Sequence, residues 1–194
     1  MTKENYNMNT MIISAFPACG KTYLYRNQNV LKFRTFKYNT DQLSFLDSDS
    51  SKFEKKEGWE KRYVDYIESK LGTVDFIFIS QHEEVLQELN NRKIPFVIVV
   101  PENLPWTDEH KKELIKQQWF GRFILRDNSH IKDFERWLNL LKDNYDNWTS
   151  LEHIMKHNPV TFLTLKEDQY LKDIMSDLCF MKERYPELYC EKGE

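Results

Sequence analysis

The segment at residues 15–22, AFPACGKT, holds the residue types that bind a phosphate chain. In the pattern G-x-x-x-x-G-K-[ST], loop amides wrap the β-phosphate, the lysine reaches the β- and γ-phosphates, and the hydroxyl binds Mg²⁺. Gly20, Lys21 and Thr22 match this pattern, whereas Ala15 replaces its first glycine, which is tolerated if φ is negative there. We therefore predict an ATP site here; the alternative is a coincidental turn. The predicted nucleotide contacts are Ala15, Pro17, Ala18, Cys19, Gly20, Lys21, Thr22 and Tyr23.

Two carboxylates, Asp47 and Asp49, follow the second apolar segment as D-S-D. At the end of a strand beside the phosphate-binding segment, the two carboxylates can point toward that segment. An acceptor would lie between the carboxylates and the segment. The alternative is a solvated turn, the usual role of Asp and Ser in such loops. The third apolar segment ends in SQH at 80–82 and carries no Walker B acid. A bound Mg²⁺ would therefore lack a ligand from this strand.

The elements that must position these groups follow from the apolar pattern. Strands are expected at 11–13, at 41–45 leading into the acidic loop 46–51, and at 74–80, 96–100 and 160–165. Helices are expected at 22–26, 53–71, 83–92, 131–148 and 168–184, and a helix and loop at 107–126. The third and fourth strands are apolar throughout, which is typical of a parallel sheet covered by helices on both faces. The fold class is therefore α/β.

Weaker signals lie outside these motifs. His82 follows the third strand and can line the acceptor site, because strand carboxyl ends face the ligand crevice. Trp59 and Tyr63 recur at helical spacing, which favours a core position over a base-stacking platform. His153 and His157 are four residues apart without a third ligand, which favours a surface pair over a metal site.

In these motifs the chain resembles the P-loop nucleotide kinases, and especially a group of small phage-encoded kinase-like proteins. The resemblance rests on AFPACGKTYL, LDSDSSKF, FIFIS followed by a helix, PFVIVVPE, and IKDFERWLNLLKDNYDNW leading to LKEDQYL. Only the first of these is a specific motif. The resemblance implies a three-layer P-loop NTPase fold in one domain, 1–194, with a five-stranded, mostly parallel sheet and a helical lid insert at 105–130.

The resemblance also implies roles for single residues. In shikimate and polynucleotide kinases a similar acidic pair orients the acceptor and contacts the Mg²⁺ shell. By this resemblance Asp47 holds Mg²⁺ through water and Asp49 orients the acceptor. Lid arginines close on the transferred phosphate, and Arg122 and Arg126 are the candidates, although an ordinary solvated helix is the alternative. The expected catalytic residues are Lys21, Asp47, Asp49, Arg122 and Arg126, and the expected metal ligands are Thr22 and Asp47.

The expected function is an ATP- and Mg²⁺-dependent kinase that phosphorylates a nucleoside monophosphate or a nucleoside-type acceptor. One alternative is a kinase for a hydroxyl on DNA or on a modified base, similar to polynucleotide or hydroxymethylpyrimidine kinases. Another is a non-catalytic nucleotide-binding switch, which the missing Walker B acid and guanine motif make less expected.

Composition limits the partners and the compartment. The net charge of −3 provides no overall positive field, so nucleic acid is possible as a partner but not indicated. No apolar stretch approaches the ~20 residues of a membrane span, and residues 1–9 lack the order of a secretory signal. Cys19, Cys179 and Cys190 lack the spacing of a disulfide framework or a zinc site. We therefore expect a cytoplasmic protein, in the host cytoplasm if phage-encoded, that is a monomer or homodimer.

Overall fold

The computed structural model describes residues 10–34, 42–48, 50, 53–125 and 134–185. In chain order its elements are β1 (Met11–Ala15), α1 (Lys21–Asn27), β2 (Phe45–Asp47), α2 (Trp59–Lys70), β3 (Phe76–Ile79), α3 (Glu83–Asn91), β4 (Val97–Pro101), α4 (Glu109–Leu125), α5 (Phe134–Trp148), α6 (Leu151–Lys156), β5 (Thr161–Leu165) and α7 (Leu171–Arg184). The strands form one five-stranded sheet in the order β2-β3-β1-β4-β5. Every neighbouring pair is parallel, so the predicted α/β class is confirmed and the sheet is wholly parallel.

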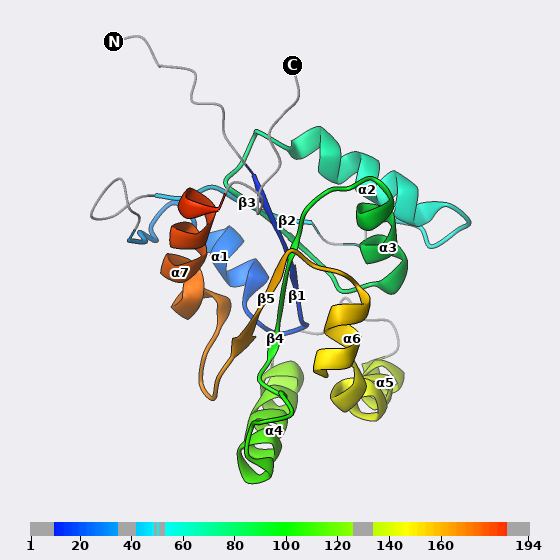
Figure 1. The fold of residues 1–194 in the computed structure, drawn as a ribbon, viewed down its shortest axis with the longest axis vertical. Coiled ribbons are helices and arrows are strands. Elements are labelled where there is room, and N and C mark those ends of the chain that lie inside the picture. Colours follow the sequence, from blue (N-terminus) through cyan, green and yellow to red (C-terminus); the bar gives the residue numbers. More distant parts are fainter. Residues whose placement is uncertain (1–9, 35–41, 49, 51–52, 126–133, 186–194) are drawn as a thin grey trace.

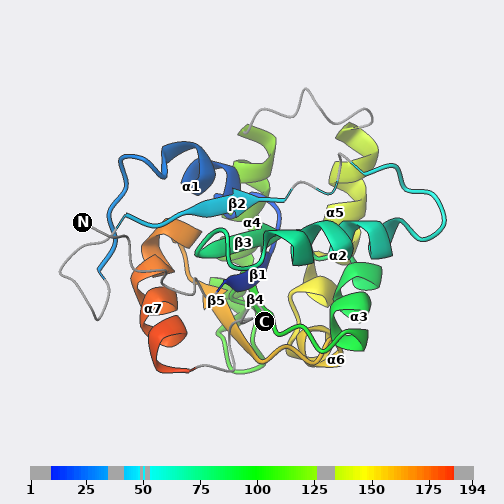
Figure 2. The same ribbon diagram turned by 90° about the horizontal axis from the view of Figure 1, so that it is seen from above.

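Helices cover both faces of this sheet. Figure 1 shows α1 and α7 on one side and α2, α3 and α6 on the other. Seen from above in Figure 2, α1 and α7 remain separated from α3 and α6 by the strands. The strand order explains this division, because the chain moves one way from β1 to β2 and the opposite way from β2 through β3 to β4. Right-handed crossovers then place α1 on one face and α2 and α3 on the other.

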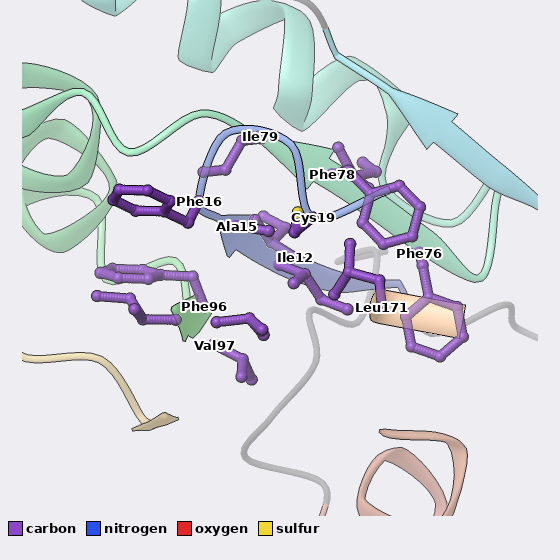
Figure 3. Close-up of a cluster of buried hydrophobic side chains, with 14 of the residues drawn as sticks. Ile12, Ala15, Phe16, Cys19, Phe76, Phe78, Ile79, Phe96, Val97 and Leu171 are labelled. Carbon is purple, nitrogen blue, oxygen red and sulfur yellow. The ribbon is translucent and has the colours of Figure 1, made fainter. Parts of the chain in front are cut away.

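The core lies on the three inner strands. Every residue of β1, β3 and β4 is buried, as expected for strands with helices on both faces. In Figure 3 side chains of β1 and β3 gather with Phe96 and Val97 at the start of β4 and Leu171 of α7. Cys19, from the segment after β1, lies in the same cluster. The candidate phosphate-binding segment is therefore attached directly to the core.

Two predicted helix starts were wrong. Helix α2 begins at Trp59 rather than residue 53, because Gly58 precedes it with φ 70°, a left-handed conformation that glycine adopts without strain. Helix α7 begins at Leu171 rather than residue 168, because Asp168 has φ 61°, outside the helical region. Helix α5 begins at Phe134, and the three preceding positions of its predicted range lie outside the described residues.

The lid prediction concerns residues 105–130, of which 126–130 lie outside the described residues. The remainder is mostly α4, a continuous helix of 17 residues. Ile115, Trp119 and Phe123 are buried along one face of α4. This part of the segment is therefore packed on the core. Within the described residues, no helix is both long and apolar enough to cross a membrane.

Asp75, just before β3, ties the sheet to α7. Its carboxylate accepts hydrogen bonds from the backbone N–H (2.9 Å) and hydroxyl (2.8 Å) of Ser44. The Lys182 ammonium of α7 lies 3.0 Å away. Burial alone would raise the pKa of Asp75, but the Lys182 charge and the Ser44 hydrogen bonds together outweigh it and lower the pKa below 3.8.

Replacing Asp75 by asparagine is expected to destabilise the fold by about 1–2 kcal/mol at pH 7, because Lys182 loses its ionised partner. The carboxylate's contribution is fully present above 3.8, its ordinary pKa, and is lost as the pH falls through the lower pKa of the folded state. Urea unfolding of both proteins from pH 7 downward should therefore show a stability gap that closes below pH 4. Asp177→Asn, at an exposed position of α7, is the matched control. A gap that is constant with pH would contradict the assigned ion pair.

Candidate functional site

The sheet itself marks one place for a ligand. The chain leaves β1 into α1 on one face, and it leaves the neighbouring strand β3 into α3 on the opposite face. Because the strands are parallel, both connections start at the same edge of the sheet. Open α/β sheets bind ligands in the crevice outside the strand carboxyl ends at such a reversal. Residues 16–20 connect β1 to α1 and therefore lie at this reversal.

These residues form a tight turn between β1 and α1. Ala15 ends β1 outside the left-handed region, so the condition for replacing the first glycine of the motif is met. Ala18 has φ 62° and Gly20 has φ 98°. The left-handed conformation at Ala18 costs about 1 kcal/mol and persists only where surrounding contacts hold it. A side chain at Gly20 would be strained and would also contact the Tyr170 ring at 3.6 Å.

Contacts from three other elements hold this turn. The hydrogen bonds run from Phe16 N–H to Val99 O (2.9 Å), from Trp119 Nε1 to Pro17 O (2.7 Å) and from Leu171 N–H to Cys19 O (2.9 Å). The Cys19 side chain is completely buried (Figure 3), and burial raises the pKa of its thiol. The turn is therefore fixed before any ligand binds, and Cys19 is an un-ionised anchor rather than a reactive group.

The Lys21 ammonium folds back over the turn. Its Nζ donates to Ala15 O and to Phe16 O (3.2 Å), and the Cys19 sulfur lies 4.0 Å away. Backbone carbonyls thus hold a positive charge inside the concave side of the turn. An ammonium carries three N–H donors. When an anion binds, these donors can leave the two carbonyl oxygens and donate to oxygens of the anion.

Thr22 and Asp47 meet although they are 25 residues apart in sequence. The Thr22 hydroxyl donates to Asp47 Oδ2 over 2.6 Å, which joins the first turn of α1 to the end of β2. A carboxylate and a hydroxyl are oxygen ligands of the kind that Mg²⁺ accepts together with water and phosphate. Within the described residues no group of three or more His, Cys, Asp or Glu side chains could hold a metal. An ion here would need the phosphate oxygens as further ligands.

Arg122 also lies beside the turn. Its Nη1 donates to Gln169 O over 2.7 Å, and its guanidinium stands 4.1 Å from the centre of the Tyr170 ring. The same guanidinium is 4.9 Å from the Trp119 ring, whose Nε1 contacts the turn. The structure therefore places Arg122 on the α7 side of the predicted nucleotide contacts.

The remaining residues that the sequence predicted for the site do not share one location. Tyr23 is 49% exposed on α1, while Pro17 and Ala18 are partly buried in the turn. Asp49 and Arg126 lie outside the described residues. The histidine pair is not the surface pair that we expected, because His157 is only 4% exposed.

A second polar group lies at the ends of β2 and β3, and we call it the Ser50 cluster: Lys55, Ser50, Trp59, Ser80 and His82. The Ser80 hydroxyl donates to Ser50 Oγ over 3.0 Å, and His82 Nε2 lies 3.0 Å from the same oxygen. The Trp59 ring meets the His82 ring edge-on with centroids 5.3 Å apart. The Lys55 ammonium is 3.1 Å from the centre of the Trp59 ring. Sequence reasoning indicated His82 but missed Lys55, which lies in an unremarkable charged run.

His82 is neutral at physiological pH. Burial, the Lys55 charge and the Lys21 charge act in the same direction and lower its pKa to about 4, against a smaller opposing effect of Glu84. Because Lys21 also acts on this ring, the Ser50 cluster lies within electrostatic range of the turn. Trp59, which is 9% exposed, belongs both to the core and to this cluster.

Searches with the sequence and the fold against protein-family models, curated proteins and solved structures found no match. The chemistry is therefore inferred from the turn at 15–20, the Lys21 ammonium, the Thr22–Asp47 hydrogen bond and the Ser50 cluster.

Proposed function

We propose that the chain binds ATP with Mg²⁺ at residues 15–22 and transfers the γ-phosphoryl group to a nucleoside monophosphate or a nucleoside-type acceptor. One observation carries this proposal: the Lys21 ammonium is turned into a preformed turn at the sheet reversal, beside the Thr22–Asp47 hydrogen bond. The resemblance to P-loop nucleotide kinases supports the same assignment.

The contacts suggest how a triphosphate would be held. Lys21 would exchange the carbonyls of Ala15 and Phe16 for β- and γ-phosphate oxygens, and amides of the turn would donate to the same chain. Thr22 and Asp47 would hold Mg²⁺, with Asp47 acting through water as the resemblance implies. The bound ion would neutralise charge that develops on the phosphates. The rest of the catalytic effect would come from positioning and charge.

Arg122 is a candidate for stabilising that charge. Its present hydrogen bond goes to a backbone carbonyl, which is a partner that an anion can replace. The Tyr170 ring, over which the guanidinium lies, is itself beside Gly20. We assign Arg122 to the nucleotide side of the site. The proposed roles of Asp49 and Arg126 rest on the resemblance alone.

The experiment is a transfer assay with γ-labelled ATP, the full chain and Mg²⁺, on nucleosides, nucleoside monophosphates and oligonucleotides. Binding of a non-hydrolysable ATP analogue is measured in parallel by calorimetry. We expect binding that depends on Mg²⁺ and transfer to at least one acceptor. Binding without transfer to any member of the panel would favour the nucleotide-dependent switch instead. Absence of binding would reject the proposal.

A further inference from the structure

Three members of the Ser50 cluster, Ser50, Ser80 and His82, form a chain of uncharged hydrogen-bonding groups. Ser50 Oγ receives a hydrogen bond from Ser80 and contacts His82 Nε2, both at 3.0 Å. Ser48, which precedes Ser50 by two residues, is fixed to β3 and α2, because its N–H donates to Phe78 O and the Tyr63 hydroxyl donates to its carbonyl. Hydroxyl and neutral imidazole groups can donate and accept. This chain therefore suits a ligand that does both, such as an alcohol.

Within the part of the chain that the structure describes, Lys55, Arg62 and Arg122 already have other contacts. The Lys55 ammonium lies over the Trp59 ring, 3.1 Å from its centre. The Arg62 guanidinium donates to the backbone carbonyls of Glu57 (3.0 Å) and Glu54 (3.4 Å). Arg122 lies on the opposite side of the turn, against Tyr170.

A phosphate acceptor fits this setting poorly. Its dianion would lie near the Asp47 carboxylate and against a His82 ring that burial keeps uncharged. Placing a charged group in such surroundings is costly unless a cation pairs with it. An alcohol carries no such penalty and can use the hydrogen bonds of the cluster.

We propose that the acceptor is an uncharged hydroxyl of a nucleoside or of a nucleic-acid end, oriented by Ser50 and His82. This inference rests on the proposed function and specifies its acceptor. In the reaction the acceptor oxygen bonds to the γ-phosphorus, the bond from that phosphorus to the β-phosphate oxygen breaks, and ADP leaves with the electron pair. The hydroxyl proton passes to a phosphoryl oxygen and then to water, so the products are a phosphate ester, ADP and a proton.

The test separates the two acceptor classes by their reactive groups. Nucleosides and a 5′-hydroxyl oligonucleotide offer hydroxyls, whereas 2′,3′-dideoxynucleoside 5′-monophosphates offer a phosphate without a sugar hydroxyl. With the full chain, Mg²⁺ and labelled ATP, we expect label on the first group only. Label on the dideoxy monophosphates, or on neither group while ATP binds, overturns this inference and leaves the ATP site intact. Loss of ATP binding itself rejects the proposed function.

Two variants locate the effect in the Ser50 cluster. Ser50→Ala and His82→Gln should each raise KM for the hydroxyl acceptor about tenfold, the effect expected from one lost hydrogen bond, and leave KM for ATP within about twofold. His110→Gln, at an exposed position of α4, is the matched control and should change neither constant. Thermal unfolding identifies a variant that fails to fold, in which case the other variant decides. Equal changes in both constants, or no change, would contradict the assignment.

Discussion

Replacing Lys21 by alanine is expected to weaken binding of the Mg²⁺-ATP complex about 10²–10⁴-fold, because two charge-assisted hydrogen bonds of about 1.5–3 kcal/mol each are lost. Turnover should fall further, by about 10²–10³, because the same ammonium would stabilise charge that develops in the transition state. Calorimetry with a non-hydrolysable analogue and single-turnover label transfer measure the two effects.

The fold should survive this change. Among the described residues, the Lys21 ammonium has hydrogen-bond contacts with the carbonyls of Ala15 and Phe16 and with the sulfur of Cys19. We therefore expect the free energy of unfolding to change by less than about 1 kcal/mol. Lys156→Ala is the matched control, since this exposed lysine pairs with Glu83 on another part of the surface. Equal ATP affinity in the Lys21 variant and the wild type would contradict the assigned role.

The second large effect is expected at Asp47. Replacing it by asparagine should lower turnover about 100-fold at millimolar Mg²⁺ and raise the Mg²⁺ concentration needed for half-maximal rate, because the ion loses its only charged protein partner in the proposed site. Thr22→Val removes the hydroxyl that donates to Asp47 at nearly constant volume. If both residues serve one ion, the losses of the two single variants should not add in the double variant.

Asp146→Asn supplies the control for this series, because Asp146 is an exposed aspartate that pairs with Lys116 on a different surface. Its turnover and Mg²⁺ dependence should match the wild type. Strictly additive losses at Thr22 and Asp47, with an unchanged Mg²⁺ requirement, would show that the two residues do not share an ion.

The inner strands β3 and β4 could be predicted because their burial leaves a simple pattern, whereas β2 is Phe45–Asp47 and the predicted 41–45 was wrong. The strands β3 and β4 are buried throughout, and their sequences are correspondingly apolar throughout. Helix starts were harder, because the signals at Gly58 and Asp168 are backbone conformations that the periodicity of side chains does not contain. The start of α7 at Leu171 depends on Asp173, whose carboxylate accepts from Tyr170 N–H over 2.8 Å.

The site was predictable only where a short motif specifies it. Segment 15–22 contains its own pattern, so Lys21 and Thr22 could be named from sequence. The expectation that Asp47 comes from the strand adjacent to β1 was wrong, because β3 lies between β1 and β2, and Asp47 instead meets Thr22 of α1. In the Ser50 cluster, His82 could be indicated from its place after the third strand, but Lys55 could not, because it lies in an unremarkable charged run. The cluster forms through the packing of α2 on the strand ends.

The central claim is that a triphosphate chain is held by the backbone of residues 16–22 and by Lys21. Residue-resolved hydrogen exchange with and without Mg²⁺ and a non-hydrolysable ATP analogue tests it directly. We predict that the analogue slows exchange of the amides at 18–23, and that Lys21→Ala abolishes this protection. Protection confined to other parts of the chain, or protection of these amides that persists in the variant, would contradict it.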